Sequence, residues 1–167
     1  MKPALTKEFL SKLLSYDPET GHFTWIVGRQ CVRAGTRAGH LMPDGYVRII
    51  VAGSGYYAHR LAFIITQGYC PQFVDHINRN KSDNRISNLR GATRSQNKMN
   101  MPVRRDSTTG VRGIRYRRDR ERYEAYLRVD RRCVYLGTFL DAKSAGEAYA
   151  RAAKAKFGEF YEGTGSG

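Results

Sequence analysis

The most informative part of this chain is a polar stretch in its middle, Val74-Asp75-His76-Ile77-Asn78-Arg79-Asn80-Lys81-Ser82-Asp83-Asn84-Arg85-Ile86-Ser87-Asn88-Leu89-Arg90, which leads into Ala92-Thr93-Arg94-Ser95-Gln96-Asn97. Residues 73–77 predict a short strand that enters a polar loop. Thr93 and Gln96 have the spacing of a capping box, which predicts a helix beginning at Arg94. Acidic, imidazole and amide side chains therefore gather between the end of a strand and the start of a helix.

These side chains suit the hydrolysis of a phosphodiester bond. The reaction needs a base that takes a proton from water, and histidine is suited because its pKa lies near 7. It also needs stabilisation of the departing 3′ oxygen, which a hard divalent cation held by oxygen ligands provides. Neighbouring strand residues point to opposite faces, so Asp75 can face a metal while His76 faces the water. Asn97 offers an amide oxygen from the following helix, and Asn88, on a short helix begun by Ser82 or Asp83, can bridge the loop backbone.

The spaced set resembles the HNH family, specifically the ββα-metal nucleases of phage and intron homing endonucleases. The Asp75-His76 pair, the asparagine thirteen positions after Asp75 and the one twenty-two after it follow that family's order. The pattern Asp83-Asn84-Arg85-x-x-Asn88-Leu89-Arg90 fits as well. The similarity extends upstream to three short segments, Tyr16-Asp17-Pro18-Glu19-Thr20-Gly21, Asp44-Gly45-Tyr46 and Ala58-His59-Arg60-Leu61.

The resemblance implies a role for each matching residue. Asp75 and Asn97 would bind the metal, His76 would be the general base, and Asn88 would be structural. Many relatives have histidine as the last ligand, whereas this chain has Asn97, which favours Mg²⁺ over Zn²⁺ and lets Mn²⁺ substitute. The three cysteines form no CxxC pair, so no zinc site is expected either.

Three further residues near the motif are weaker candidates. His59 is interpreted first as a structural histidine at a helix start, with a supporting role in the site as the alternative. Arg60 and Arg85 could hold phosphates, but they could equally be solvated. All three are kept as candidates for phosphate binding or support.

Outside this motif, the N-terminal half has short alternating patterns. Residues 6–15 predict a helix capped by Thr6. Residues 23–26 and 45–51 predict strands, and a turn at residues 53–55 leads into 56–58 as a hairpin. Residues 59–67 predict another helix. We therefore expect a nuclease domain over residues 1–100, with its core motif at 56–100.

The charge of the chain indicates a polyanionic partner. The 29 basic and 15 acidic residues give a formal net charge of +14. Such an excess repels itself in a compact fold unless it faces a polyanion, which is usually nucleic acid. Ribosomal or membrane-surface proteins show similar totals, so charge alone does not name the function. No apolar stretch is long enough to span a membrane and the start has no signal-peptide core, so a cytoplasmic location on DNA is expected.

A different pattern follows a linker expected at residues 101–110. Strand signals at 111–116, 122–129 and 133–137 precede an alanine-rich helix from about 141 to 157, which Gly158 is placed to end. This part, residues 111–162, resembles the plant ethylene-response-factor type of DNA-binding domain, in which a three-stranded sheet is backed by one helix. The match rests on Gly110-Val111-Arg112, 123–128, 134–139 and the helix, whereas Tyr123 and Tyr135 stand where tryptophan is usual. Residues 163–167 are expected to be a tail.

This second part is expected to contact DNA through one face of its sheet. In the middle strand, Tyr123, Ala125 and Leu127 share the face toward the helix, and Glu124 shares the outward face with Tyr126 and Arg128. Eleven arginines and no lysine fall between residues 104 and 132, and arginine can grip guanine or phosphate at two places. A solvated basic sheet is the alternative. The expected DNA contacts are Arg112, Arg115, Arg117, Arg122, Tyr126, Arg128 and Tyr135.

The sequence thus predicts an α+β protein in which a ββα-metal nuclease core precedes a three-stranded sheet packed on one helix. The expected activity is metal-dependent cleavage of duplex DNA at a preferred site, leaving 5′-phosphate and 3′-hydroxyl ends. One site per chain favours nicking by a monomer unless two chains meet as a dimer on the DNA. The alternatives are a non-catalytic sequence-specific DNA-binding protein and a phage packaging or repair nuclease of low specificity.

Overall fold

The computed structural model of the chain describes residues 5–28, 31–103 and 107–161, which form two compact units. The first unit covers residues 1–93 and the second covers residues 94–167. The division falls before α3, whose residues Met99 and Asn100 are buried, and the hydroxyl of Tyr149 in the same unit lies 3.7 Å from Met99 Sδ. Among the described residues, no helix combines the length and apolarity that crossing a bilayer requires.

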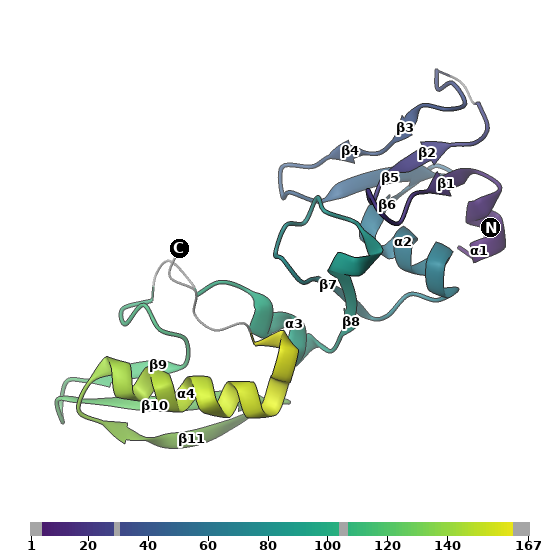
Figure 1. The fold of residues 1–167 in the computed structure, drawn as a ribbon. Coiled ribbons are helices and arrows are strands. Elements are labelled where there is room, and N and C mark those ends of the chain that lie inside the picture. The colour runs from purple at the N-terminus through teal and green to yellow at the C-terminus, as the bar shows by residue number, and fades with distance from the viewer. Residues whose placement is uncertain (1–4, 29–30, 104–106, 162–167) are drawn as a thin grey trace. The chain divides into compact units, whose positions relative to one another are not determined.

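The first unit consists of short strands and helices around one apolar cluster (Figure 1). In chain order its elements are α1 (Lys7–Ser11), β1 (Leu14–Tyr16), β2 (Phe23–Trp25), β3 (Arg37–Ala38), β4 (His40–Leu41), β5 (Val47–Val51), β6 (Ser54–Tyr57), α2 (Ala58–Gln67), β7 (Phe73–His76), η1 (Ile86–Asn88) and β8 (Leu89–Ala92). The strands form two antiparallel three-stranded sheets, β1-β2-β3 and β4-β5-β6, and the antiparallel pair β7-β8. Buried side chains from α1, both sheets, α2 and the β7-β8 pair form the core.

The second unit is an antiparallel sheet with a long helix along one face (Figure 1). Its elements are α3 (Arg94–Asn100), β9 (Ile114–Arg117), β10 (Arg122–Val129), β11 (Arg132–Phe139), α4 (Ala142–Phe157) and η2 (Gly158–Phe160). Ala145 and Ala153 of α4 and Ala125 of β10 are fully buried, because small side chains let the helix lie close to the strand. Asp141 caps α4 by accepting a 2.8 Å hydrogen bond from the backbone N–H of Ser144.

Several sequence-based expectations for this unit are confirmed and one is wrong. β10 and α4 lie where they were predicted, and β11 extends the predicted strand at both ends. The first strand begins at Ile114 rather than at residue 111, because Gly113 turns the chain with a φ of +71°. A Cβ on Gly113 would lie 2.4 Å from both the carbonyl oxygen of Tyr126 and the ring of Tyr149, so this position requires glycine.

In the first unit the mixed α and β composition is confirmed, but two details differ from the prediction. The expected helix over 6–15 ends at Ser11, and Leu14 instead starts β1, where it pairs with Trp25 and is buried in the core. Burial against a strand outweighs the helical spacing of the leucines. β3, β4 and β8 were not predicted, because these segments of two to four residues lack the β-branched and aromatic side chains that signal a strand. Residues 104–106 of the expected linker and the expected tail, residues 163–167, lie outside the described residues.

Candidate active site

The β7-β8 pair positions the two residues that the sequence singled out. Asp75 and His76 are the last residues of β7, and both are 5% exposed. Across the pair, Asp75 is opposite Arg90 and His76 is opposite Leu89. The strand ends where the polar loop over residues 77–88 begins, so both side chains lie at the junction of a buried strand and a polar surface loop.

Arg90 holds the carboxylate of Asp75. Its Nε donates a 2.9 Å hydrogen bond to Asp75 Oδ2, and both side chains are largely buried. A buried carboxylate is stable when a paired charge and hydrogen bonds replace its hydration. Arg90 was quoted in the motif but received no role from the sequence, because the pairing depends on the β7-β8 register.

Asn84 is a second site residue that the sequence analysis did not assign. Its Oδ1 lies 3.4 Å from His76 Nε2, and its Nδ2 donates a 3.0 Å hydrogen bond to the carbonyl of Ser82, which fixes which amide atom faces the imidazole. A carbonyl oxygen facing Nε2 favours the tautomer with the proton on Nε2 and the lone pair on Nδ1. Burial lowers the pKa of His76 below its ordinary value, and the Asn84 hydrogen bond opposes part of this shift. His76 is therefore a neutral base at pH 7.

Asn88 joins two points of the loop. Its Oδ1 accepts a 3.0 Å hydrogen bond from the backbone N–H of Asn78, and its Nδ2 donates a 2.9 Å bond to the carbonyl of Asp83. These are the contacts that a structural role requires. Asn88 lies on the 3-10 helix η1, which starts at Ile86, so the short helix expected to begin at Ser82 or Asp83 starts later than predicted.

The segment over residues 16–21 contacts the backbone of the loop at Asn84 and Arg85. The hydroxyl of Tyr16 donates a 2.8 Å hydrogen bond to the carbonyl of Asn84. A Cβ on Gly21 would lie 2.5 Å from the backbone of Asn84 and Arg85, and Gly21 has a φ of +72°, so glycine is required for this close approach. The upstream segment that carried part of the family resemblance thus contacts the residue that orients His76.

The two arginine candidates of this unit already have protein partners. Arg85 makes a bidentate ion pair with Asp83, at 2.8 Å from Nε to Oδ1 and 2.6 Å from Nη2 to Oδ2. Arg60 donates a 3.2 Å hydrogen bond to the carbonyl of Gln72, just before β7. Both interactions stabilise the frame of the site and favour support over phosphate binding.

His59 lies in an aromatic cluster with the proposed base. Its ring centroid is 5.1 Å from that of His76 in an edge-on arrangement, 5.2 Å from Tyr46 and 5.6 Å from Tyr57, with which it is stacked. Burial, with smaller contributions from His76 and Arg60, lowers the pKa of His59 to about 3. The imidazole is therefore neutral at any pH at which the protein would work.

The carboxylate of Asp75 and the amide oxygen of Asn97 are the types of ligand that a hard divalent cation prefers. Asp75 offers a buried carboxylate in the first unit, whereas Asn97, on α3, belongs to the second unit, so a site that joins them stays a prediction. The described residues contain no group of three or more histidine, cysteine, aspartate or glutamate side chains that could hold a metal ion.

The register of the second unit places most of the expected DNA contacts on one face. Arg115 pairs with Glu124 and Arg117 with Arg122, while Tyr126 pairs with Tyr135, and paired residues project to the same side. Ala125 and Leu127 are buried on the opposite side, as expected. Glu124 lies on the outward face as expected, but it is 8% exposed, and its carboxylate accepts a 2.9 Å hydrogen bond from the hydroxyl of Tyr126. The outward face, which we call the arginine face, consists of Arg115, Arg117, Arg122, Glu124, Tyr126, Arg128 and Tyr135.

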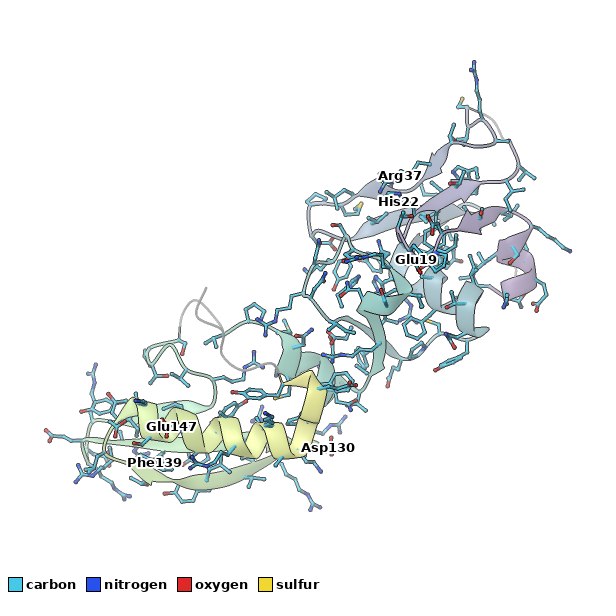
Figure 2. The ribbon with its side chains drawn as sticks, in the orientation of Figure 1. Glu19, His22, Arg37, Asp130, Phe139 and Glu147 are labelled. Atoms are coloured by element: carbon cyan, nitrogen blue, oxygen red, sulfur yellow. The ribbon has the colours of Figure 1, made fainter. Side chains whose placement is uncertain are left out.

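Two expected DNA contacts are occupied within the unit. The guanidinium of Arg112 donates to the carbonyls of Lys98, Met99, Met101 and Pro102 at and beyond the end of α3. This argues against the expected role of Arg112 on DNA. Arg117 makes a bidentate pair with Asp119, at 3.0 and 3.1 Å. Asp130, labelled in Figure 2, lies in the turn between β10 and β11, where it accepts a 3.2 Å hydrogen bond from Ser95 of α3.

Comparisons with known proteins concern the first of these sites. A family model described as HNH endonuclease matches residues 56–99, which include Asp75, His76, Asn84 and Arg90. This match indicates a nuclease role for the segment. The match does not extend to β9, β10, β11 or α4, so the likeness of that part to ethylene-response-factor domains stays a prediction.

A match among solved structures is described as DNA binding and cleavage by the HNH homing endonuclease I-HmuI. The two chains are 30% identical, with a TM-score of 0.42, and the match covers 53% of this chain. This chain spans about half of that one, 51% of its length. A search of curated proteins found no match.

Proposed function

We propose that this protein is a metal-dependent DNA endonuclease in which His76 is the general base and Asp75 and Asn97 are the metal ligands. The observation that carries the proposal is the pair formed by His76 and Asn84 at the end of β7, inside the segment that matches the HNH endonuclease family. An amide that holds the lone pair of a buried, neutral histidine on Nδ1 serves proton abstraction. A histidine that only filled space would not need such an orienting partner.

The proposed chemistry follows from these groups. The Nδ1 atom of His76 takes a proton from a water molecule as the water oxygen attacks phosphorus. The P–O3′ bond breaks and the departing O3′ takes a proton from solvent water, which leaves a 5′-phosphate and a 3′-hydroxyl, and His76 later returns its proton to solvent. A divalent cation, Mg²⁺ or Mn²⁺, would supply charge stabilisation at the phosphate when bound. Arg90 holds the Asp75 carboxylate in place, and the loop bonds of Asn88 keep Asn84 against His76.

The arginine face of the second unit is proposed to hold duplex DNA, as the resemblance to ethylene-response-factor domains suggests. Arginine forks can grip phosphates and guanine edges, and exposed tyrosines add contact area. Arg115, Arg122 and Arg128 are exposed on this face, whereas Arg117 would have to exchange its pair with Asp119 for a DNA contact. We propose that the full chain acts on DNA in the cytoplasm, as a monomer or as a dimer assembled on DNA.

The test is cleavage of a supercoiled plasmid by the full chain, followed by mapping of the ends. With Mg²⁺ or Mn²⁺ we expect nicked or linear product whose 5′-phosphate and 3′-hydroxyl ends DNA ligase can rejoin, and EDTA should abolish the product. Retarded DNA with no cleavage in either metal would indicate a non-catalytic binding protein instead. Ends scattered over the plasmid, rather than concentrated at one site, would favour a nuclease of low specificity.

A further inference from the structure

His59 has a surrounding that packing alone does not explain. It is the second residue of α2, directly after β6, and is 7% exposed. Its ring contacts Tyr46, Tyr57 and the proposed base His76. Those ring contacts would be made equally well by phenylalanine, which has no polar atoms to bury.

The imidazole of His59, unlike a phenyl ring, carries a buried nitrogen that accepts or donates no hydrogen bond within the described residues. Nδ1 of His59 is buried and has no hydrogen-bond partner among the described residues. A buried polar atom without a partner destabilises a fold, because it has lost its bond to water and gained nothing. Such an atom beside a reactive group is explained if its partner arrives with the substrate.

The charge state of His59 limits what that partner can be. The ring is neutral, since burial lowers its pKa to about 3. A neutral imidazole has one N–H donor and one acceptor, so it can donate a hydrogen bond without adding a positive charge beside His76. The group that a nuclease brings next to its base, and that accepts hydrogen bonds, is the phosphodiester.

We propose that the neutral imidazole of His59 donates a hydrogen bond to a non-bridging oxygen of the scissile phosphate and so aligns the phosphorus with the water that His76 activates. The inference rests on the proposed nuclease function and adds a substrate-contacting residue to it. The ring of Tyr57 stacks on His59 and is 39% exposed, so the aromatic cluster that contains His59 reaches the protein surface.

The test couples His59 to a single oxygen atom of the DNA. The full chain, His59→Phe and His59→Gln are compared in single-turnover cleavage of a duplex that carries an Rp or an Sp phosphorothioate at the mapped cleavage site. His59→Phe keeps the ring and removes the donor, whereas His59→Gln keeps an N–H donor. His22→Phe is the matched control, because His22, labelled in Figure 2, is an exposed histidine of the same unit. Thermal unfolding and DNA affinity in Ca²⁺ check that each variant is folded and bound.

We expect one diastereomer to slow the wild type and His22→Phe by about tenfold or more, as loss of a hydrogen bond to a charged group does, with no rescue by Mn²⁺. The same sulfur should slow His59→Phe by less than about twofold, because the bond is already absent there. His59→Gln should retain part of the effect. Equal effects of both diastereomers in wild type and His59→Phe would overturn the role of His59 while cleavage itself persists. If His59→Phe does not fold, His59→Gln decides the question: a slower rate together with a reduced sulfur effect supports the donor, and an unchanged rate with an unchanged sulfur effect overturns it. Absence of any cleavage of the all-oxygen duplex would overturn the nuclease proposal, and this inference with it.

Discussion

At the residue scale, the candidate site depends on the neighbours of the two residues that the motif names. His76 is oriented by Asn84 and Asp75 by Arg90, at 3.4 and 2.9 Å. The same scale separates arginines that serve the fold from arginines that face solvent. Arg112 donates to four backbone carbonyls, whereas Arg128 is exposed on the arginine face. Equal charge therefore does not mean equal function.

This contrast predicts opposite effects for two alanine substitutions. Arg112→Ala should lower the free energy of unfolding by about 2 kcal/mol, because a charged donor to several carbonyls is lost. Arg128→Ala should leave stability unchanged and weaken duplex binding, with the log–log salt slope flattened by about 0.9 if one phosphate contact is lost. Urea unfolding and DNA titrations over a salt series measure both quantities.

Arg112→Lys and Arg151→Ala are the controls for this pair. Lysine cannot fork between carbonyls, so Arg112→Lys should restore little of the lost stability. Arg151 is an exposed residue of α4, the helix on the opposite face of the sheet, and its loss should leave both quantities unchanged. Weakened DNA binding by a stable Arg112→Ala would return Arg112 to the DNA contacts.

The sequence placed Asp75 and His76 correctly as an adjacent pair at a strand end, since the apolar residues before them and the polar loop after them carry that information. It could not name Arg90 or Asn84 as their partners. The pairing of Asp75 with Arg90 depends on strand register, and the approach of Asn84 to His76 depends on how the seven residues between them, 77–83, fold back. Neither the strand register nor the path of the loop can be inferred from a local sequence pattern.

At the element scale, the loop over residues 77–88 supplies the polar groups next to the end of β7, including Asn84 beside His76. Hydrogen bonds of the Asn88 side chain and the Asp83–Arg85 ion pair link residues within the loop. The turn at Gly21 packs closely against the loop backbone. The side chain of Asp83 accepts hydrogen bonds from Arg85 and Asn78, which lower its pKa from 3.8 to about 2. The loop conformation is thus stabilised by the ionised carboxylate of Asp83.

This pKa shift predicts an acid-dependent contribution to stability. Because the pKa of Asp83 is lower in the folded chain, the contribution is fully present above about pH 4 and is lost as the pH falls toward 2. Asp83→Asn should therefore lower the free energy of unfolding at pH 7, and the difference from wild type should shrink steadily toward pH 2. Denaturant titrations across this range measure the difference. Glu147→Gln, an exposed change on α4 labelled in Figure 2, is the control, and a gap that stays constant with pH would refute the role of Asp83.

Elements with a long periodic pattern, or with β-branched and aromatic residues, were predictable, whereas short elements without such residues were not. α2, β10 and α4 lie where their periodicity placed them. α1 was predicted too long because the apolar spacing of Leu13 and Leu14 continues a helical pattern, although the core takes Leu14 in a strand. β8 carries Arg90, so the strand that escaped prediction is also the one that supplies the partner of Asp75.

At the scale of the whole molecule, the residues proposed for the site lie in two different compact units. Asp75 and His76 belong to the first unit, while Asn97 lies on α3, which is packed within the second unit. A truncation near residue 101 would remove the packing of α3 within the second unit. The net charge of +14 gives the full chain a general attraction to DNA. The arginine face would add preference for particular DNA sequences.

The most direct test of the central claim is single-turnover cleavage of a duplex with the mapped site, by wild type and His76→Ala in Mg²⁺, alongside their DNA affinities in Ca²⁺. A base that acts on water contributes about 10²–10⁴ to the rate and little to DNA binding. We therefore predict that His76→Ala loses cleavage by at least about a hundredfold, with its dissociation constant within about threefold of wild type. Cleavage by His76→Ala at a rate near that of wild type would contradict the account.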